Sequence, residues 1–518
     1  MSIFFSDTAG YLDDFQKYLS INLEISNQVL KLVKTTLGPS SMDKFLFTSD
    51  KNNLISNDGA TILNSIGINH PIAKIIIEIA KSQDYEVGDG TTTVCLLSFE
   101  FINAAKKLND EGIHIKKISK IFKKGVMLVN KFSSEICENK KFQTTEELKK
   151  FLISCCATSL NSKFIAGKRH IFSEIIADIG ISLGSNFDQN IISVKSIVGG
   201  SASDSFLFQG ILIKKPFSYA GSEKQYKKIR YPFILLLDIE LELKSEKMDS
   251  ETKIKKISKY KELIDAEWSL IYEKLDLIAK SGAKAVFSKQ PIGDLATQYF
   301  AERGILCGGR ISNDDMTRLT KGTNGAVVST LLNLKENSIG RCSLIEERQI
   351  GNDRYVLISG LVSEINTIVI RGSNLKILEE IKRCLNDGIM IVKKVIKDQR
   401  IVGGAGSIEM KLVAKIKKYA ESLNRVEQVV LNKFASCLEI IPRTLCENAG
   451  YDPTLILSKL STAHRNKNCW DGVDIENGDT FDALDNYIWE PISVKENAIA
   501  AAVEASCIIT SIDNVLFN

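Results

Sequence analysis

Apolar side chains at three- and four-residue steps run through both ends of the chain. In residues 22–36 this spacing predicts a helix that ends at Gly38 and Pro39. The same pattern predicts further helices over 71–83, 91–108, 115–137, 375–396, 407–423, 426–448 and 492–510. Two short apolar runs, at 45–47 and 54–55, flank a polar turn and predict a hairpin. Both ends of the chain are therefore expected to be mainly helical.

The middle of the chain has a different pattern. Short apolar runs predict strands over 191–197, 211–214, 233–238, 285–288, 304–306, 343–350, 355–359 and 367–371. A helix expected over 293–303 lies between two of these strands, which indicates a small α/β domain. A charge-rich stretch over 246–280 carries a hydrophobic stripe and predicts one long amphipathic helix or two in succession, with the stripe facing either the core or a partner. The order of helices, then strands, then helices is better explained by a central α/β segment inserted into one discontinuous helical domain than by three domains in a row.

Length and charge narrow the class of protein. At 518 residues the chain exceeds the roughly 250–300 residues of a single hydrophobic core, so about three or four domains are expected. Its 44% hydrophobic and 25% charged residues are ordinary for a globular protein. The net charge of +4 is small for this length, which disfavours a nucleic acid as the main partner.

Cysteine, histidine and apolar segments exclude other classes. The 11 cysteines include no C-x-x-C pair and the chain has only 4 histidines, so a structural zinc cluster is not expected. There is no N-terminal secretory pattern, and no apolar run reaches the roughly 20 residues of a membrane span. We therefore expect a soluble protein of a reducing compartment that has no membrane partner.

Glycine-containing turns carry the candidate chemistry. Three of them lie near the N-terminus, over 36–43, 57–61 and 88–93. The third reads GDGTTT and precedes an apolar helix, so free N–H groups, the positive end of the helix dipole and three hydroxyls converge there. That arrangement suits a phosphate with Mg²⁺ on Asp89, although an ordinary N-cap turn is the alternative. A fourth cluster, GGAG over 403–406, precedes a helix expected near Glu409; the chain has no Walker motif and no nucleophile–histidine pattern.

Taken together, these segments resemble the group II chaperonins. The motifs are TTLGPSSMDK, SNDGATIL, VGDGTTTV, GGAGSIEM, CENAGYDP and WDGVDIENGD followed by WEP, and they occur in the order and spacing of that family. The resemblance covers essentially the whole chain. Within the family, the central segments FSYAGSEKQYKK and LDIELELKSEK are similar to eta-type subunits of the eukaryotic cytosolic chaperonin.

The resemblance implies a multidomain fold that combines α+β and α/β parts. A mainly helical equatorial ATPase domain is expected over 1–140 and 398–518. A small intermediate domain is expected over 141–213 and 366–397. An α/β apical substrate-binding domain is expected over 214–365, with a helical protrusion that forms a lid at about 246–280.

The resemblance also implies a site for ATP or ADP with Mg²⁺. Asp58 and Asp387 match the two carboxylates used in hydrolysis, and Asp89 matches the magnesium ligand. The matching nucleotide-binding positions are Gly38 and Pro39 beside the phosphates, Gly90, Thr91, Thr92 and Thr93 at the helix N-terminus, Asn161, Ser162 and Lys163 in the loop that senses the terminal phosphate, Gly404, Ala405 and Gly406 along the pocket, and Glu490 and Lys495 near the ribose and adenine.

Three positions depart from the family pattern. Ser41 stands where glycine is usual, so it carries a conformational cost if its φ must be positive. Ala405 also stands where glycine is usual and places a methyl group where the backbone is expected to approach the nucleotide. Gly388 stands where alanine is common and lowers helix stability by about 1 kcal/mol. These changes favour weak turnover, whereas the retained Asp58, Asp89 and Asp387 favour a competent ATPase.

The functional hypothesis is therefore an ATP-dependent chaperone subunit whose hydrolysis drives lid closure and protein folding. The family implies a cytoplasmic hetero-oligomeric double ring of eight subunits per ring, clients such as actin and tubulin, and prefoldin as a co-chaperone. The main alternative is a structural ring subunit that binds nucleotide but hydrolyses it weakly or not at all. A metabolic ATP-dependent kinase is disfavoured because no second-substrate motif is present.

Overall fold

The computed structural model describes residues 11–47, 53–68, 70–140, 142, 144–184, 188–214, 226–242, 257–331, 338–466 and 469–512. Contacts divide the chain into two compact units. Unit 1 combines Met1–Phe187 with Glu379–Asn518, and unit 2 is the inserted segment Asp188–Leu378. The segments expected to form the intermediate domain are divided between these units, and the three-domain boundaries remain a prediction.

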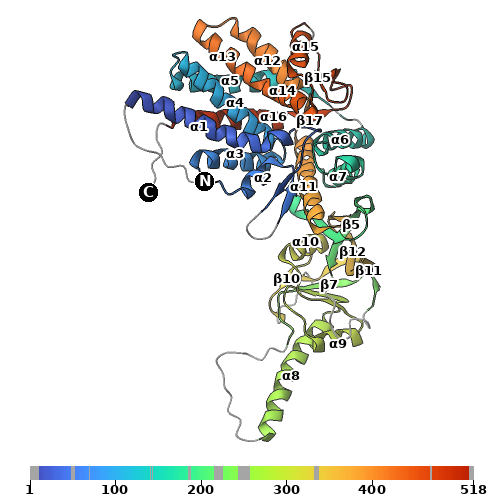
Figure 1. The fold of residues 1–518 in the computed structure, drawn as a ribbon. Coiled ribbons are helices and arrows are strands. Elements are labelled where there is room, and N and C mark those ends of the chain that lie inside the picture. Colours follow the sequence, from blue (N-terminus) through green and yellow to red (C-terminus); the bar gives the residue numbers. More distant parts are fainter. Residues whose placement is uncertain are drawn as a thin grey trace. The chain divides into compact units, whose positions relative to one another are not determined.

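Unit 1 is a layered helical assembly around α4 and α16 (Figure 1). These two helices contact each other, with α5 and α13 packed on one side and α1 and α3 on the other. Its helices are α1 (Tyr11–Val33), α2 (Gly59–Ser65), α3 (Pro71–Val87), α4 (Thr91–Asp110), α5 (Ile115–Ile136), α6 (Thr145–Leu160), α7 (Arg169–Leu183), most of α11 (Leu375–Lys397), α12 (Ser407–Ala420), α13 (Arg425–Leu438), α14 (Ile440–Ala449), α15 (Pro453–Asn466) and α16 (Ile492–Ser511).

Aromatic packing fixes the centre of unit 1. The rings of Phe101, Phe122 and Phe434 come from α4, α5 and α13, are each no more than 1% exposed, and have centroids 5.0 to 5.7 Å apart. Gly125 lets the Phe434 ring approach α5, because a Cβ there would lie 2.9 Å from the ring. Three small sheets complete the unit: β1 (Lys44–Leu46) with β2 (Leu54–Ser56), β3 (Glu138–Asn139) with β14 (Arg400–Gly403) and β17 (Trp489–Pro491), and β15 (Asp471–Asp474) with β16 (Asp479–Asp482).

Unit 2 contains a ten-stranded sheet whose main path runs β4-β13-β5-β12-β11-β7-β8-β9. Its strands are β4 (Ile192–Val198), β5 (Phe206–Lys214), β6 (Lys228–Arg230), β7 (Phe233–Leu237), β8 (Ala285–Ser288), β9 (Leu306–Gly308), β10 (Val327–Val328), β11 (Gly340–Ile350), β12 (Asp353–Leu361) and β13 (Asn366–Gly372). Strands β7, β8 and β9 are parallel, as expected for strands joined through helices.

Helices cover both faces of this parallel part. Ile234 and Leu236 of β7 join the core that includes α10 (Asn313–Thr323), whereas Leu235 and Leu237 join the core that includes α8 (Ile257–Lys280) and α9 (Asp294–Glu302). Because successive strand residues point to opposite faces, the uninterrupted apolar run of β7 is the signature of a strand buried on both sides. The predicted α/β centre is confirmed.

Most predicted elements lie where the hydrophobic pattern places them, but several boundaries were wrong, such as the start of β5 at 206 rather than 211. The first helix begins at Tyr11 rather than 22, and β9 occupies 306–308 rather than 304–306, because Gly304 turns the chain with a φ of +67°. The helix predicted over 426–448 is two helices, α13 and α14. Pro442 explains the break, because it has no N–H to bond the carbonyl four residues earlier.

Several other expectations were incomplete. Helices α2, α6, α7, α10 and α15 were not predicted. The amphipathic stretch forms one helix, α8, over its described part. Three segments lie outside the described residues: 243–256, the range 215–225 that includes most of the FSYAGSEKQYKK motif, and 48–52 of the hairpin turn. Among the helices of the described part, none is long and apolar enough to cross a membrane.

Candidate functional site

Two left-handed glycines shape the first part of the site. Gly88 ends α3 with a φ of +77°, and Gly90 precedes α4 with a φ of +81°, so Asp89 lies in a sharp turn between the two helices. A side chain at either glycine would be strained in this backbone conformation. The Asp89 carboxylate accepts the N–H of Gly90 at 2.7 Å, and the side-chain amide of Gln83 donates to the Asp89 carbonyl at 2.9 Å. The turn is therefore held from both sides.

The N-terminus of α4 supplies donors to the same place. Its first helical bond runs from the N–H of Val94 to the carbonyl of Gly90, so the N–H groups of Thr91, Thr92 and Thr93 precede the helical ladder. All three threonines are 6 to 7% exposed. The Thr92 hydroxyl lies 3.2 Å from that of Thr36, which ends the 3₁₀ turn after α1. Hydroxyls, N–H groups and the positive end of the helix thus meet at one point.

Asp58 is the N-cap of α2 and links it to α4. One carboxylate oxygen accepts the N–H and the hydroxyl of Thr61 at 2.9 and 2.7 Å, and the other accepts the hydroxyl of Thr91 at 3.0 Å. Burial alone would raise the pKa of Asp58, but the Lys163 ammonium and these hydrogen bonds hold the pKa below its ordinary value. Asp58 is therefore an ionised carboxylate at neutral pH.

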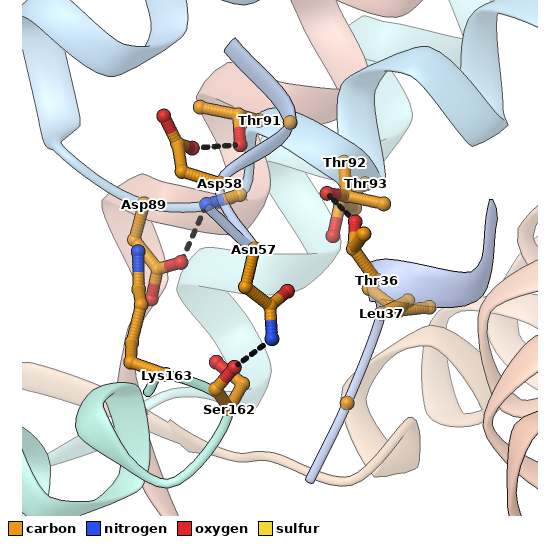
Figure 2. A pocket seen from close by; sticks show the side chains of 13 residues that line it. Thr36, Leu37, Asn57, Asp58, Asp89, Thr91, Thr92, Thr93, Ser162 and Lys163 are labelled. Atoms are coloured by element: carbon orange, nitrogen blue, oxygen red, sulfur yellow. Dashed lines mark hydrogen bonds between the residues drawn. The ribbon is translucent and has the colours of Figure 1, made fainter. Parts of the chain in front are cut away.

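Lys163 reaches the site from the loop after α6. Its ammonium lies 2.6 Å from the carboxylate of Asp387 on α11, and the two side chains are 10% and 15% exposed. Asp387, Asp89 and Asp58 together raise the pKa of Lys163, despite its burial, so the lysine stays charged. Figure 2 shows its side chain extending alongside Asp89. One cation is therefore shared by three carboxylates.

Four segments line a hollow of about 360 Å³ that is open to solvent (Figure 2). The lining residues are Thr36, Leu37, Gly38, Asn57, Asp58, Gly59, Asp89, Gly90, Thr91, Thr92, Thr93, Ser162 and Lys163. Nine of the positions expected to bind nucleotide, metal or water are among them, namely Gly38, Asp58, Asp89, Gly90, Thr91, Thr92, Thr93, Ser162 and Lys163. The site expectations themselves remain predictions.

The remaining expected residues lie outside this lining. Asp387 reaches it through Lys163, whereas the side-chain oxygen of Asn161 accepts a hydrogen bond from Arg169. Pro39 follows Gly38 but does not line the hollow. Gly404, Ala405, Gly406, Glu490 and Lys495 form a neighbouring cluster of their own.

That neighbouring cluster is built on a buried ion triad. The Lys495 ammonium lies 2.9 Å from Glu409 and 2.7 Å from Glu490, and these carboxylates raise the pKa of Lys495 against the effect of burial. Gly404 makes room for Glu490, because a Cβ at this glycine would lie 2.6 Å from the glutamate oxygen. Gln83 joins the triad to the glycine turn, since its amide group reaches the carbonyls of both Asp89 and Val494.

Sequence reasoning missed two groups in the site. The Asn57 side-chain amide donates to the Ser41 hydroxyl at 2.7 Å and to the Ser162 carbonyl at 3.0 Å, which ties three segments together. Asp84, one turn before Gly88, has a pKa raised to about 6 by burial and by the nearby carboxylates of Asp58 and Asp89. Asn57 lay inside a noted turn motif, but no sequence signal distinguishes Asp84 from a surface carboxylate.

The three departures have different structural meanings. The φ of Ser41 is not positive, so the expected strain is absent, and its hydroxyl accepts from Asn57 instead. Ala405 adopts a positive φ of +54°, so the conformational cost considered for Ser41 applies at Ala405 instead. Gly388 packs against two neighbouring helices, because a Cβ there would lie 2.7 Å from Ile176 and 3.2 Å from Cys156.

The donor set suits a hard divalent cation held together with a phosphate. Asp89 presents a carboxylate beside threonine hydroxyls and helix N–H groups. Mg²⁺ usually takes one or two protein carboxylates and completes its shell with water and phosphate oxygens. Over the described parts of the chain, no group of three or more His, Cys, Asp or Glu side chains is arranged to hold a metal ion.

The sequence model of the TCP-1/cpn60 chaperonin family matches residues 29–518. The chain belongs to this chaperonin family. It is 42% identical over 501 residues to T-complex protein 1 subunit eta of Arabidopsis thaliana, covering 96% of this chain and 90% of the relative. It is also 41% identical over 498 residues to the human eta subunit, covering 96% and 92%, and 43% identical over 505 residues to that of Tetrahymena pyriformis, covering 96% and 90%.

These comparisons confirm the predicted resemblance to chaperonins and to their eta subunits. The helical unit 1 and the α/β unit 2 agree with the predicted multidomain chaperonin fold. Membership of the chaperonin family gives the chain a chaperone function in protein folding and places it in a nucleotide-dependent class of proteins.

Proposed function

We propose that this chaperonin subunit binds ATP with Mg²⁺ and hydrolyses it, and that hydrolysis drives lid closure and the folding of enclosed proteins. The observation that carries the proposal is the meeting of four segments at one hollow, where the α4 N-terminus, Lys163 and the carboxylates of Asp58 and Asp89 lie together and Asp387 is paired with Lys163. Phosphoryl transfer to water requires charge neutralisation and a positioned water more than covalent chemistry. The residues of the hollow are of the kinds that provide both.

The phosphates would lie against the α4 N-terminus. The N–H groups of Thr91, Thr92 and Thr93 and the hydroxyls of Thr92 and Thr93 would donate to phosphate oxygens, and Lys163 would neutralise the terminal phosphate. Asp89 would hold Mg²⁺, which supplies charge neutralisation between the phosphates. Gly38 allows close approach of the chain there, because its φ of +87° and the contact with Leu445 exclude a side chain.

Water activation would fall to Asp58 and Asp387. Asp58 is ionised and fixed by three hydrogen bonds, so it can orient a water molecule without moving. Asp387 is buried, and burial raises its pKa to about 8 against the opposing effect of Lys163. The ionised form of Asp387, which the Lys163 ammonium favours, can accept a proton from an attacking water as a general base.

The neighbouring triad would lie at the nucleoside end of the ligand. Gly404, Ala405 and Gly406 bring backbone close to Glu490, whose carboxylate would accept from the ribose hydroxyls. Lys495 compensates the charge of that carboxylate, and Pro39 and Asn161 would border the phosphates. This part of the proposal follows the family resemblance more than the lining of the hollow.

The partners follow from the same class. We propose assembly with other chaperonin subunits in a cytoplasmic hetero-oligomeric double ring with eight subunits per ring. Clients would include proteins such as actin and tubulin, delivered with prefoldin as co-chaperone. The apical domain over 214–365 would bind clients, with its protrusion at about 246–280 acting as the lid. The relatives are named as subunits, which supports assembly.

Metal-dependent nucleotide binding tests this proposal. Labelled ATP should bind the full-length chain in the presence of Mg²⁺, and Asp89→Asn should weaken that binding at least about tenfold while leaving metal-free binding nearly unchanged. Asp474→Asn is the matched control, since Asp474 also caps a turn, by accepting from Glu476 and Asn477, but is remote from the hollow. Equal binding by the Asp89 variant and the wild-type chain would overturn the assignment.

A further inference from the structure

A buried serine connects the two segments that carry Asp58 and Asp387. Ser56 is the last residue of β2 and is 1% exposed. Its hydroxyl donates to the Glu380 carboxylate at 3.1 Å and accepts the backbone N–H of Asp58 at 3.2 Å. The hydroxyl therefore bonds directly to the backbone of one proposed water-orienting residue and to the helix that carries the other.

Glu380 is suited to hold that serine in one place. It is 4% exposed and lies on α11 seven residues before Asp387. One of its oxygens is paired with Arg383, at 2.8 Å from Nε and 2.6 Å from a terminal nitrogen, and the other accepts from Ser56. A buried carboxylate is unfavourable unless it is paired and hydrogen-bonded, and here both oxygens are engaged.

Helix geometry relates this contact to the reacting groups. Seven residues are about two helical turns, so Glu380 and Asp387 lie on nearly the same face of α11, about 10 Å apart along its axis. Asp58 is two residues after Ser56 and is fixed on its other side by Thr61 and Thr91. The Ser56–Glu380 bond thus links the segment that carries Asp58 to helix α11, which carries Asp387.

We propose that the Ser56–Glu380 hydrogen bond is a positioning contact that fixes the separation of the Asp58 and Asp387 carboxylates. It acts on the hydrolytic step and not on nucleotide binding, because neither residue lines the hollow. Small displacements of reacting groups reduce rates strongly, whereas the N–H groups at the N-terminus of α4 are placed by the backbone of that helix. The inference rests on the proposed ATPase function.

Two nearly isosteric variants isolate the hydroxyl. Ser56→Thr keeps the hydroxyl and Ser56→Val replaces it with a methyl, and both β-branched side chains suit the end of a strand. The assay is steady-state Mg-ATP hydrolysis by the assembled complex. The rate of this subunit is the part of the total rate that is lost when this subunit carries Asp387→Ala. We expect Ser56→Val to lower kcat about tenfold with KM changed less than about twofold, and Ser56→Thr to restore most of the rate.

Controls separate positioning from general destabilisation. Ser26→Ala removes an equally buried hydroxyl, 1% exposed, that bonds only within α1, and it should leave kcat unchanged. Glu380→Gln keeps a carbonyl oxygen for Ser56, so its kcat should fall less than that of Ser56→Val. If Ser56→Val fails to assemble, Ser56→Thr and Glu380→Ala are compared at temperatures where the two variants are equally stable. The lower kcat is then expected for Glu380→Ala.

The outcomes distinguish this inference from the proposed function. If Asp387→Ala leaves hydrolysis unchanged, the ATPase proposal fails and the positioning proposal fails with it. If Asp387→Ala removes a measurable rate but Ser56→Val matches Ser56→Thr in kcat, only the positioning proposal is overturned. A rise in KM without a fall in kcat would likewise overturn it, because that result assigns the contact to binding.

Discussion

The buried Lys163–Asp387 pair gives the sharpest stability prediction. Its nitrogen–oxygen distance is 2.6 Å, with side chains 10% and 15% exposed. The pair Lys459–Asp479 has nearly the same distance, 2.8 Å, but its side chains are 55% and 56% exposed. Lys163→Met and Lys459→Met therefore remove the same charge from similar geometry at different burial.

The expected costs follow from what each variant leaves behind. Removing one partner of a buried pair typically costs about 3–5 kcal/mol, because the other charge remains buried without compensation. Removing one partner of an exposed pair costs less than about 1 kcal/mol. Asp387 can take up a proton when Lys163 is absent, since burial already raises its pKa to about 8. We therefore expect Lys163→Met to cost about 3 kcal/mol at high pH.

The pH dependence has a definite sign. In Lys163→Met the folded-state pKa of Asp387 lies above its unfolded value, so the folded state binds more protons between the two values. The free energy of unfolding of this variant should therefore fall as the pH rises from about 4 toward the folded pKa. Adding Asp387→Asn should recover most of the loss at high pH, because no buried charge then remains.

Urea unfolding of the full-length chain, followed by circular dichroism at about pH 6 and about pH 8.5, measures these differences. The reasoning would be refuted if Lys163→Met cost no more than Lys459→Met at the higher pH. It would also be refuted if the cost of Lys163→Met increased as the pH fell.

Three further predictions concern individual positions. Ala405→Gly should raise the free energy of unfolding by about 0.5–1 kcal/mol, because it relieves a positive φ; a loss of stability in urea unfolding would contradict this. In the wild-type background, Gly388→Ala should be nearly neutral or should destabilise the protein by up to about 2 kcal/mol, because the new Cβ meets Ile176. In a background that carries Ile176→Val, which removes the contacting methyl, Gly388→Ala should instead stabilise by about 1 kcal/mol. Additive effects in this double-mutant cycle would argue against the packing contact. Asp84→Asn should stabilise the protein by about 1–2 kcal/mol at about pH 7.5, allowing for the partial exposure of Asp84, and by almost nothing near pH 4. The reason is that the folded-state pKa of about 6 exceeds the ordinary value of 3.8, and a pH-independent effect would exclude that cause.

Hydrophobic spacing predicted most of the fold because it reports directly which faces are buried. The alternation of Leu235 and Leu237 with Ile234 and Leu236 between two cores is visible as one apolar run in the sequence. The same spacing could not reveal the break at Pro442, because the apolar stripe continues across both helices. Periodicity records the buried face of a segment but not the continuity of its backbone hydrogen bonds.

The site was predictable where its chemistry is local. The turn at Asp89 and the threonines of α4 combine glycine, a carboxylate and hydroxyls within a few residues, so the sequence alone indicated an anion site. Contacts between distant segments left no such signal. The pairing of Lys163 with Asp387 joins residues 224 positions apart, and Asp387 alone is an ordinary helical aspartate until the fold buries it.

Hydrolysis by this subunit is the central claim, and turnover by the assembled complex carrying Asp387→Ala in this subunit alone tests it most directly. Labelled-nucleotide occupancy of the subunit is measured in the same preparation, so that binding and hydrolysis are separated. The account predicts that ATP turnover and lid closure fall while occupancy is kept. Unchanged turnover and closure with normal occupancy would contradict it and would favour a structural subunit that binds nucleotide without hydrolysing it.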